Sequence, residues 1–142
     1  MFNLSSKSDY GLLLLSLLAK KKKNEFVALS EISGESGLPY AFVSRIASQL
    51  AKAGLLKSKE GANGGYKLGK KPEEISVALA IEALDGPWQP TKCEDHDEIC
   101  SHKDICPMTN QWQKNLKEKM WQVMENFTLK DLIKVKILDK PE

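Results

Sequence analysis

Apolar residues recur every three to four positions through most of the chain, which is the spacing of amphipathic helices. This spacing, with the capping and turn residues around it, predicts helices over residues 5–19, 29–35, 39–53, 75–84, 107–126 and 129–133. One stretch differs, because two short strand-like runs, 55–59 and 66–68, flank Asn63-Gly64-Gly65, a turn typical of a β-hairpin. The fold is therefore expected to be mainly α with one small hairpin.

The second and third helices match a helix-turn-helix pattern. Gly37 permits a sharp turn between them, Pro39 is well placed to begin the next helix, and Gly54 ends it. Many helical hairpins share this pattern, but here a β-hairpin follows directly, which makes a winged helix-turn-helix. In that architecture the second helix enters the major groove of DNA.

Candidate DNA contacts lie on the outer face of the helix over 39–53 and on the hairpin. Residues 1–92 hold 13 Lys and Arg against 9 Asp and Glu, whereas residues 93–142 hold 8 against 10, so the front part is the better candidate to meet a polyanion. Lysines on a hairpin can meet phosphates, or alternatively can prevent strand pairing at its edge. The candidates are Tyr40, Ala41, Phe42, Ser44, Arg45, Lys59, Asn63, Gly64, Tyr66 and Lys67.

The helices at the two ends of the chain suggest a homodimer. Leucines fill more than one face of the helix over 5–19, as expected of a buried or subunit-interface helix. The helix over 107–126 carries an apolar stripe that must pack on something, either on a second copy or back on its own domain. Two-fold symmetry is the usual arrangement of DNA readers of this type. The stripe consists of Trp112, Leu116, Met120, Val123, Met124 and Phe127.

The three cysteines of the chain, Cys93, Cys100 and Cys106, fall within fourteen residues of a highly acidic segment. Soft thiolates select iron–sulfur clusters, zinc or copper(I), and His96 and His102 could add ligands. The alternatives are three unrelated free thiols, or a disulfide with one spare cysteine. The odd count argues against a disulfide framework, and the sequence has no secretory signal pattern.

Composition excludes several other classes. The longest apolar run, residues 11–19, is too short to span a bilayer, and the lysines follow it instead of preceding it, so we expect a cytoplasmic protein without a membrane partner. An enzyme with a cysteine nucleophile is not expected, because an acidic loop raises thiol pKa values, which lowers reactivity.

Several motifs resemble a known family. They are Ser-Asp-Tyr-Gly-Leu (8–12), Gly-Leu-Pro (37–39), Leu-Ala-Lys-Ala-Gly-Leu (50–55), Gly-Ala-Asn-Gly-Gly-Tyr (61–66), Pro-Glu-Glu-Ile-Ser-Val (72–77), Ile-Glu-Ala-Leu-Asp-Gly-Pro (81–87), the cysteines and Thr-Leu-Lys-Asp-Leu (128–132). Over about residues 4–132 the chain resembles the winged-helix regulators that include the Isc and Suf iron–sulfur assembly regulators and the nitric-oxide-sensing repressors. The gaps between the cysteines, Cys106-Pro107 and Trp112 look most like the Suf-operon branch.

This resemblance implies a 2Fe–2S or 4Fe–4S cluster on the three cysteines whose state controls DNA binding. The sequence departs from the pattern at two positions. Glu60 stands where the family usually has an arginine that enters the minor groove, and Thr109 stands where Isc-type regulators have a ligand histidine. The nitric-oxide sensors take their fourth ligand from an aspartate on the first helix of the partner subunit, and Asp9 matches that position. His96 and His102 are the alternatives.

The sequence therefore predicts a winged helix-turn-helix over residues 1–87, a cysteine loop over 88–106, and a long C-terminal dimerisation helix with a tail over 107–142. The expected function is a cluster-sensing transcriptional regulator, a repressor of iron–sulfur assembly or stress genes, that binds a double-stranded DNA operator as a homodimer. The alternative is the same DNA-binding domain with a structural zinc site on its cysteines, since Cys₃His is a common zinc set.

Overall fold

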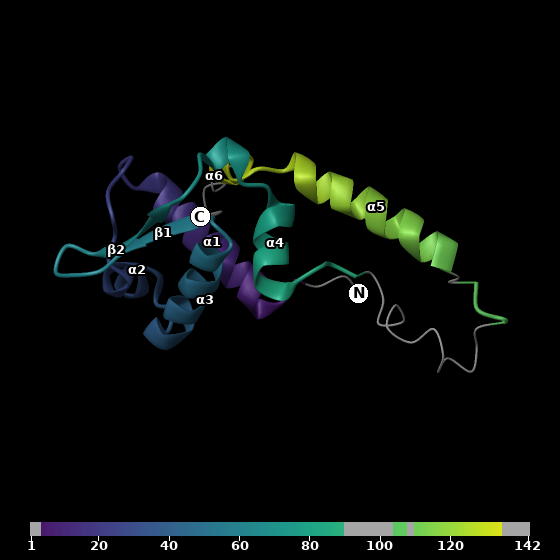
Figure 1. Cartoon of the computed structure of the whole chain (residues 1–142), viewed down its shortest axis with the longest axis horizontal. Coiled ribbons are helices and arrows are strands. Elements are labelled where there is room, and N and C mark those ends of the chain that lie inside the picture. Colours follow the sequence, from purple (N-terminus) through teal and green to yellow (C-terminus); the bar gives the residue numbers. More distant parts are fainter. Residues whose placement is uncertain (1–3, 90–103, 108–109, 135–142) are drawn as a thin grey trace, which may run out of the picture.

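A computed structural model of the chain describes residues 4–89, 104–107 and 110–134. Six α-helices, one 3₁₀ turn and a two-stranded antiparallel sheet make up this part of the molecule (Figure 1). The mainly helical winged-helix fold expected from the sequence is confirmed. In chain order the elements are α1 (Ser6–Lys20), α2 (Leu29–Ser36), α3 (Tyr40–Lys52), β1 (Leu56–Lys59), β2 (Gly65–Leu68), η1 (Pro72–Glu74), α4 (Val77–Asp85), α5 (Asn110–Asn126) and α6 (Leu129–Lys134).

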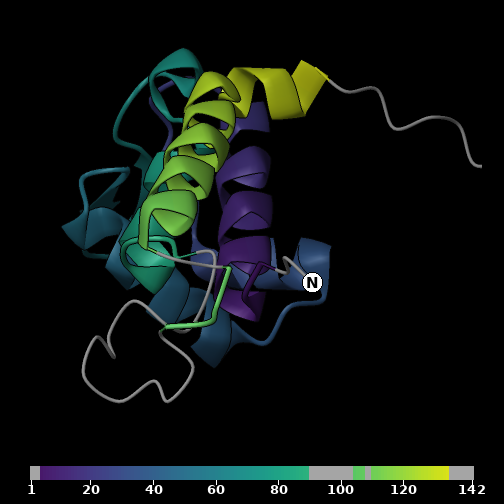
Figure 2. The same ribbon diagram turned by 90° about the vertical axis from the view of Figure 1, so that its right-hand side faces the viewer.

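Helix α1 forms the centre of the core, and α3, α4 and α6 pack around it (Figures 1 and 2). Leu14, Leu15 and Leu18 of α1 are buried. The buried residues of α3 are Val43, Ile46, Ala47 and Leu50. Tyr10 and Leu13 instead remain exposed in the single chain. The burial of α1 is therefore partial, and its exposed side carries these two apolar residues beside Asp9.

The helix-turn-helix and the wing follow the turn chemistry of the sequence. Gly37 ends α2 with a φ of 71°, a left-handed conformation that favours glycine, and Pro39 is the N-cap of α3. In the wing, Leu56 pairs with Leu68 and Lys59 with Gly65. An isolated bridge between Val27 and Tyr66 attaches the hairpin to the segment before α2. The wing is thus attached to the body through the bridge on β2 and through β1, which contacts α3.

Helix α4 packs closely on α1 because Gly11 has no side chain. A Cβ at Gly11 would lie 2.1 Å from Cδ1 of Leu84, which is a distance that real contacts do not reach. Ser76 caps α4 by accepting a hydrogen bond from the Leu79 amide. Gly11 in the Ser-Asp-Tyr-Gly-Leu motif is therefore a site of helix–helix contact.

Helix α5 contacts α4 and projects beyond the other helices, and α6 turns back to α1 (Figures 1 and 2). The return is fixed by two backbone hydrogen bonds, from the Val77 amide to the Phe127 carbonyl (2.8 Å) and from the Leu129 amide to the Ile75 carbonyl (2.7 Å). Leu129 is buried in the core. Trp112 and Val123 of α5, and Phe127 directly after it, are about half exposed, so much of the predicted stripe is uncovered in the single chain. No described helix is long and apolar enough to cross a membrane.

Candidate DNA interface and cysteine loop

The outward face of α3 is polar and accessible. Tyr40, Ala41 and Arg45 are exposed and Ser44 is half-buried, while the opposite face of the helix is buried in the core. Phe42 differs from the expectation that placed it with this outer face. Its ring packs edge-on against Tyr10, with the ring centroids 5.3 Å apart, and belongs to the rim of the core. An accessible strip with one arginine is what a groove-reading helix presents.

The wing presents its candidates in two ways. Lys59, Glu60 and Asn63 are exposed, whereas Gly64, Tyr66 and Lys67 are half-buried. A Cβ at Gly64 would lie 2.2 Å from the Lys59 carbonyl oxygen, so the tight turn needs glycine there. The Tyr66 amide and carbonyl both bond Val27, so its backbone is structural. The tip of the wing is thus narrow, and the lysines lie along its sides.

Phe26 organises two of the wing lysines. The ammonium of Lys67 lies 4.7 Å and that of Lys59 lies 5.8 Å from the centroid of the Phe26 ring. Cation–π contacts of this kind hold a lysine in place without neutralising it. Both charges remain available to an anion, a feature that the sequence pattern did not indicate.

The described residues contain one of the cysteines. Cys106 is a half-buried free thiol, while Cys93, Cys100, His96 and His102 lie outside the described residues. Within the described part of the chain, no three His, Cys, Asp or Glu side chains form a metal-binding group. The donor set of three thiolates in a short acidic segment suits an iron–sulfur cluster by its chemistry.

Asp9 is exposed in the first turns of α1. Residues 104–107 lie beyond the far end of α5, well separated from the beginning of α1 (Figure 1). Asp9 and Cys106 of one chain are therefore not brought together.

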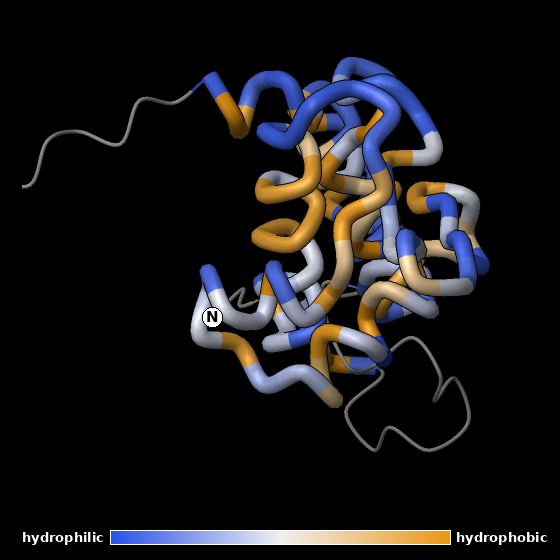
Figure 3. Tube along the Cα trace, turned by 90° about the vertical axis from the view of Figure 1, so that its left-hand side faces the viewer, coloured by the Kyte–Doolittle hydropathy of each residue, from blue (hydrophilic) through white to orange (hydrophobic). Residues whose placement is uncertain are grey.

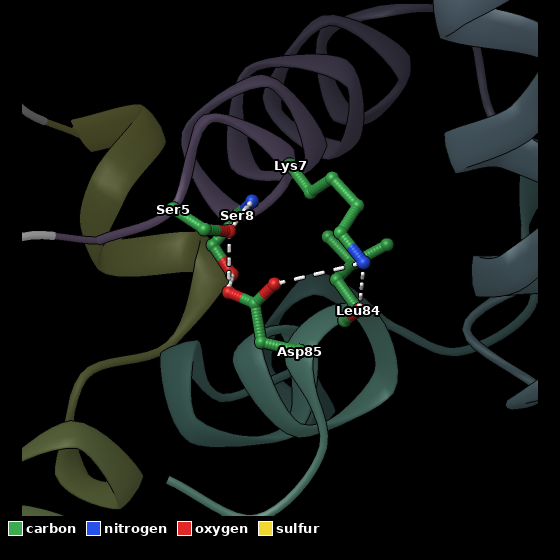
Figure 4. Close-up of polar contacts among 5 residues, drawn as sticks. All are labelled: Ser5, Lys7, Ser8, Leu84 and Asp85. Carbon is green, nitrogen blue, oxygen red and sulfur yellow. Dashed lines mark hydrogen bonds and ion pairs between the residues drawn. The ribbon is translucent and has the colours of Figure 1, made fainter. Parts of the chain in front are cut away.

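A polar cluster fixes the beginning of α1 to the end of α4 (Figure 4). One carboxylate oxygen of Asp85 accepts hydrogen bonds from the hydroxyls of Ser5 (2.5 Å) and Ser8 (2.6 Å), and Ser8 is fully buried. Lys7 donates to the Leu84 carbonyl at 3.0 Å and pairs with Asp85 at 3.9 Å. The cluster orients the turn that carries Asp9 and anchors the helix after which the cysteine loop begins. The residues are far apart in sequence, and no local motif indicated their contact.

Known proteins that are similar to this chain are transcription regulators. A model of the family described as "Rrf2: Iron-dependent Transcriptional regulator" matches residues 4–135. The regulator IscR of Pectobacterium atrosepticum is 32% identical over 130 residues, which cover 92% of this chain and 78% of that protein. The solved structure of CymR (YrzC), described as the global cysteine regulator of B. subtilis, has a TM-score of 0.74 and 30% identity and covers 96% of this chain and 99% of its own. That of T. potens IscR has a TM-score of 0.70 and 27% identity, with 99% and 93% covered.

Proposed function

Because the chain belongs to the Rrf2 family and is a DNA-binding transcriptional regulator, not an enzyme, we propose that an iron–sulfur cluster on its three cysteines controls its binding to DNA. Its targets would be iron–sulfur assembly or stress genes, which it represses. The observation that carries the proposal is the set of three cysteines at 93, 100 and 106, placed after a winged helix in a family described as iron-dependent. The likeness to two IscR proteins supports it.

The cluster ligands that we propose are Cys93, Cys100 and Cys106, with Asp9 of a second copy as the fourth. The exposure of Asp9 and the separation of α1 from residues 104–107 within one chain favour a ligand from the other subunit over one from the same subunit (Figure 1). His96 and His102 are the alternative fourth ligands. A bound cluster supplies a redox-active and nitric-oxide-sensitive group. A carboxylate is a harder ligand than a thiolate, which leaves one iron easier to displace.

The protein's own residues would transmit the state of the site to the DNA-binding surface. Asp85 holds the turn that carries Asp9 against the end of α4, and α1 contacts α3 directly. A cluster bound by Asp9 of one copy and by the cysteine loop of the other favours one arrangement of the two winged-helix domains in the dimer. Loss of the cluster releases that arrangement, which is a two-state switch.

On the DNA side, α3 would enter the major groove with Tyr40, Ala41, Ser44 and Arg45. Phe42 would contribute by holding α3 against α1 through Tyr10. The exposed carboxylate of Glu60 repels phosphates, so Glu60 cannot contact the DNA backbone. The wing would make that contact through Lys59 and Lys67 instead.

We further propose that the chain is a homodimer whose α5 helices pack together. The exposed Trp112, Val123 and Phe127 support this, because a half-exposed apolar stripe on a protruding helix is stabilised by a partner surface. Sedimentation velocity at micromolar concentration tests it, and a monomer would refute it.

The cluster is tested by anaerobic purification, absorption spectroscopy, and iron and sulfide analysis. A brown protein with matching iron and sulfide is expected, and Cys106→Ser should remove the colour. Asp9→Ala should leave a cluster with an altered spectrum and faster decay, whereas Glu82→Ala, which removes an exposed carboxylate outside the cysteine loop, should not. A colourless protein with stoichiometric zinc would refute the cluster and establish the zinc alternative. If Asp9→Ala has a wild-type spectrum while His96→Ala or His102→Ala has an altered one, the fourth ligand is a histidine of the cysteine loop and not Asp9.

A further inference from the structure

A lysine-lined recess of about 530 Å³ lies between the turn after α1 and the exit of the wing. This end of the molecule, where that turn and η1 lie in Figure 1, is hydrophilic in Figure 3. Seven of the residues that line it are lysines, against three glutamates. The lysines are Lys21, Lys22, Lys23, Lys57, Lys67, Lys70 and Lys71, and the glutamates are Glu25, Glu73 and Glu74.

One of these lysines is already neutralised. Lys21 forms ion pairs with Glu35 at 2.7 Å and Glu31 at 2.9 Å, and the hydrogen bonds to these carboxylates raise its pKa. The salt bridges among the described residues involve Lys7 and Lys21 and leave the other six lysines of the recess unpaired. One glutamate is likewise engaged, since the Glu74 carboxylate accepts a hydrogen bond from the Lys71 amide. The recess therefore carries a net positive charge.

The register of the wing concentrates this charge. Lys57 of β1 lies directly opposite Lys67 of β2. Like charges at directly opposed positions of two strands are destabilising, so the pair opposes folding unless an anion lies between the side chains. Phe26 holds the Lys67 ammonium from one side through its ring and supplies no negative charge. An unpaired lysine pair on an ordered hairpin suits an anionic ligand.

We propose that this recess is a second phosphate-binding site, and that its phosphates belong to the DNA backbone outside the segment that α3 reads. The inference rests on the proposed DNA contact of the wing and extends it. Lys67 is common to the wing contacts and the recess, so the two surfaces are continuous. The positively charged surface extends beyond the wing through four further lysines, Lys22, Lys23, Lys70 and Lys71. A longer duplex can therefore make phosphate contacts that a short duplex does not reach.

The test uses random-sequence duplexes, because phosphate contacts do not read sequence. Two double variants of the full chain, Lys22→Gln/Lys23→Gln and Lys70→Gln/Lys71→Gln, are compared with Lys130→Gln/Lys134→Gln on α6, which removes the same charge from exposed positions elsewhere. Binding is measured by fluorescence anisotropy on duplexes of about one and about three helical turns, over a range of salt concentrations. Thermal unfolding confirms that each variant is folded.

On the long duplex each recess variant should lose about fivefold in affinity for every phosphate contact removed at about 0.15 M salt, with a salt slope lower by about 0.9 per contact. On the short duplex it should bind like the control variant. Equal losses for recess and control variants on the long duplex would overturn the site.

Inorganic pyrophosphate separates a backbone phosphate from a free one. One possible result is that pyrophosphate shifts the amide resonances of Gly69 and Lys70 in the wild type but not in Lys70→Gln/Lys71→Gln, while the recess variants bind the long duplex as tightly as wild type. This result would refute DNA as the source of the phosphates and would mean that the recess binds a free phosphorylated ligand. Wild-type protein that binds neither duplex would instead refute the DNA contact of the wing. The cluster has its own spectroscopic test, which these measurements do not touch.

Discussion

The contact between Ser8 and Asp85 allows the sharpest test of how the first helix is positioned. Asp85→Ala removes the carboxylate that accepts hydrogen bonds from the hydroxyls of Ser5 and Ser8. The buried Ser8 hydroxyl is then left without this partner. A hydrogen bond to a charged group contributes about 1.5–3 kcal/mol, and an orphaned buried polar group costs about 1–3 kcal/mol. Because the Asp85 side chain is 26% exposed, we take the lower part of these ranges and expect a loss of about 2 kcal/mol.

A double-mutant cycle isolates the interaction. Ser8→Ala removes the donor and leaves Asp85 with Ser5 and water, so it should cost about 1 kcal/mol. The double variant should be less unstable than the sum of the single changes by about 1 kcal/mol, because removing Ser8 also removes the orphaned hydroxyl. Urea unfolding of the four proteins gives the free energies, and Asp85→Asn, which keeps an acceptor oxygen, is the conservative control. Additivity within about 0.3 kcal/mol would refute the coupling.

Three further changes test other parts of the molecule. Gly11→Ala should lower stability by about 1–2 kcal/mol, since the clash with Leu84 outweighs the gain in helix propensity, and thermal unfolding should show partial rescue by Leu84→Ala. Hydrogen bonds from the amide and hydroxyl of Thr128 lower the pKa of Asp131. The ionised Asp131 carboxylate therefore stabilises the fold at pH values above its unfolded pKa of about 3.9, and this contribution is lost as the pH falls through the lower pKa of the folded state. Asp131→Asn should therefore be less stable than wild type at pH 7, by urea unfolding, with the gap closing below about pH 4. Arg45→Ala should cost about 1–3 kcal/mol on a true operator, and an equal loss on random DNA would limit Arg45 to phosphate contact.

Local rules predicted much of the fold. Glycines and Asn63 marked the turns. Ser76 and Thr128 cap their helices with hydroxyl oxygens, and the buried residues of α3 follow helical periodicity closely. These features depend on a few neighbouring residues, so a single sequence contains their signal.

Contacts between distant segments were not predictable in this way. Ser8 and Asp85 are 77 positions apart, and nothing in either local pattern indicates the other. Phe42 was placed on the outer face by helical geometry alone, but Tyr10 offers its ring a partner. The cysteine ligands were found by residue type and spacing, and whether they form one site stays a prediction because most of them lie outside the described residues.

The way α5 is attached has a mechanical consequence. Its C-terminal end is fixed to the body by the hydrogen bonds of Phe127 and Leu129, and the helix then runs outward past α4, which it contacts. Seventeen residues of α-helix form a rod about 25 Å long. A rotation of about 10° at the fixed end would move the free end by about 4 Å, since displacement grows with the length of the arm. A displacement of residues 104–107 at the far end of α5 would therefore act on the winged helix over the length of the helix, as far as the contacts between α5 and α4 allow.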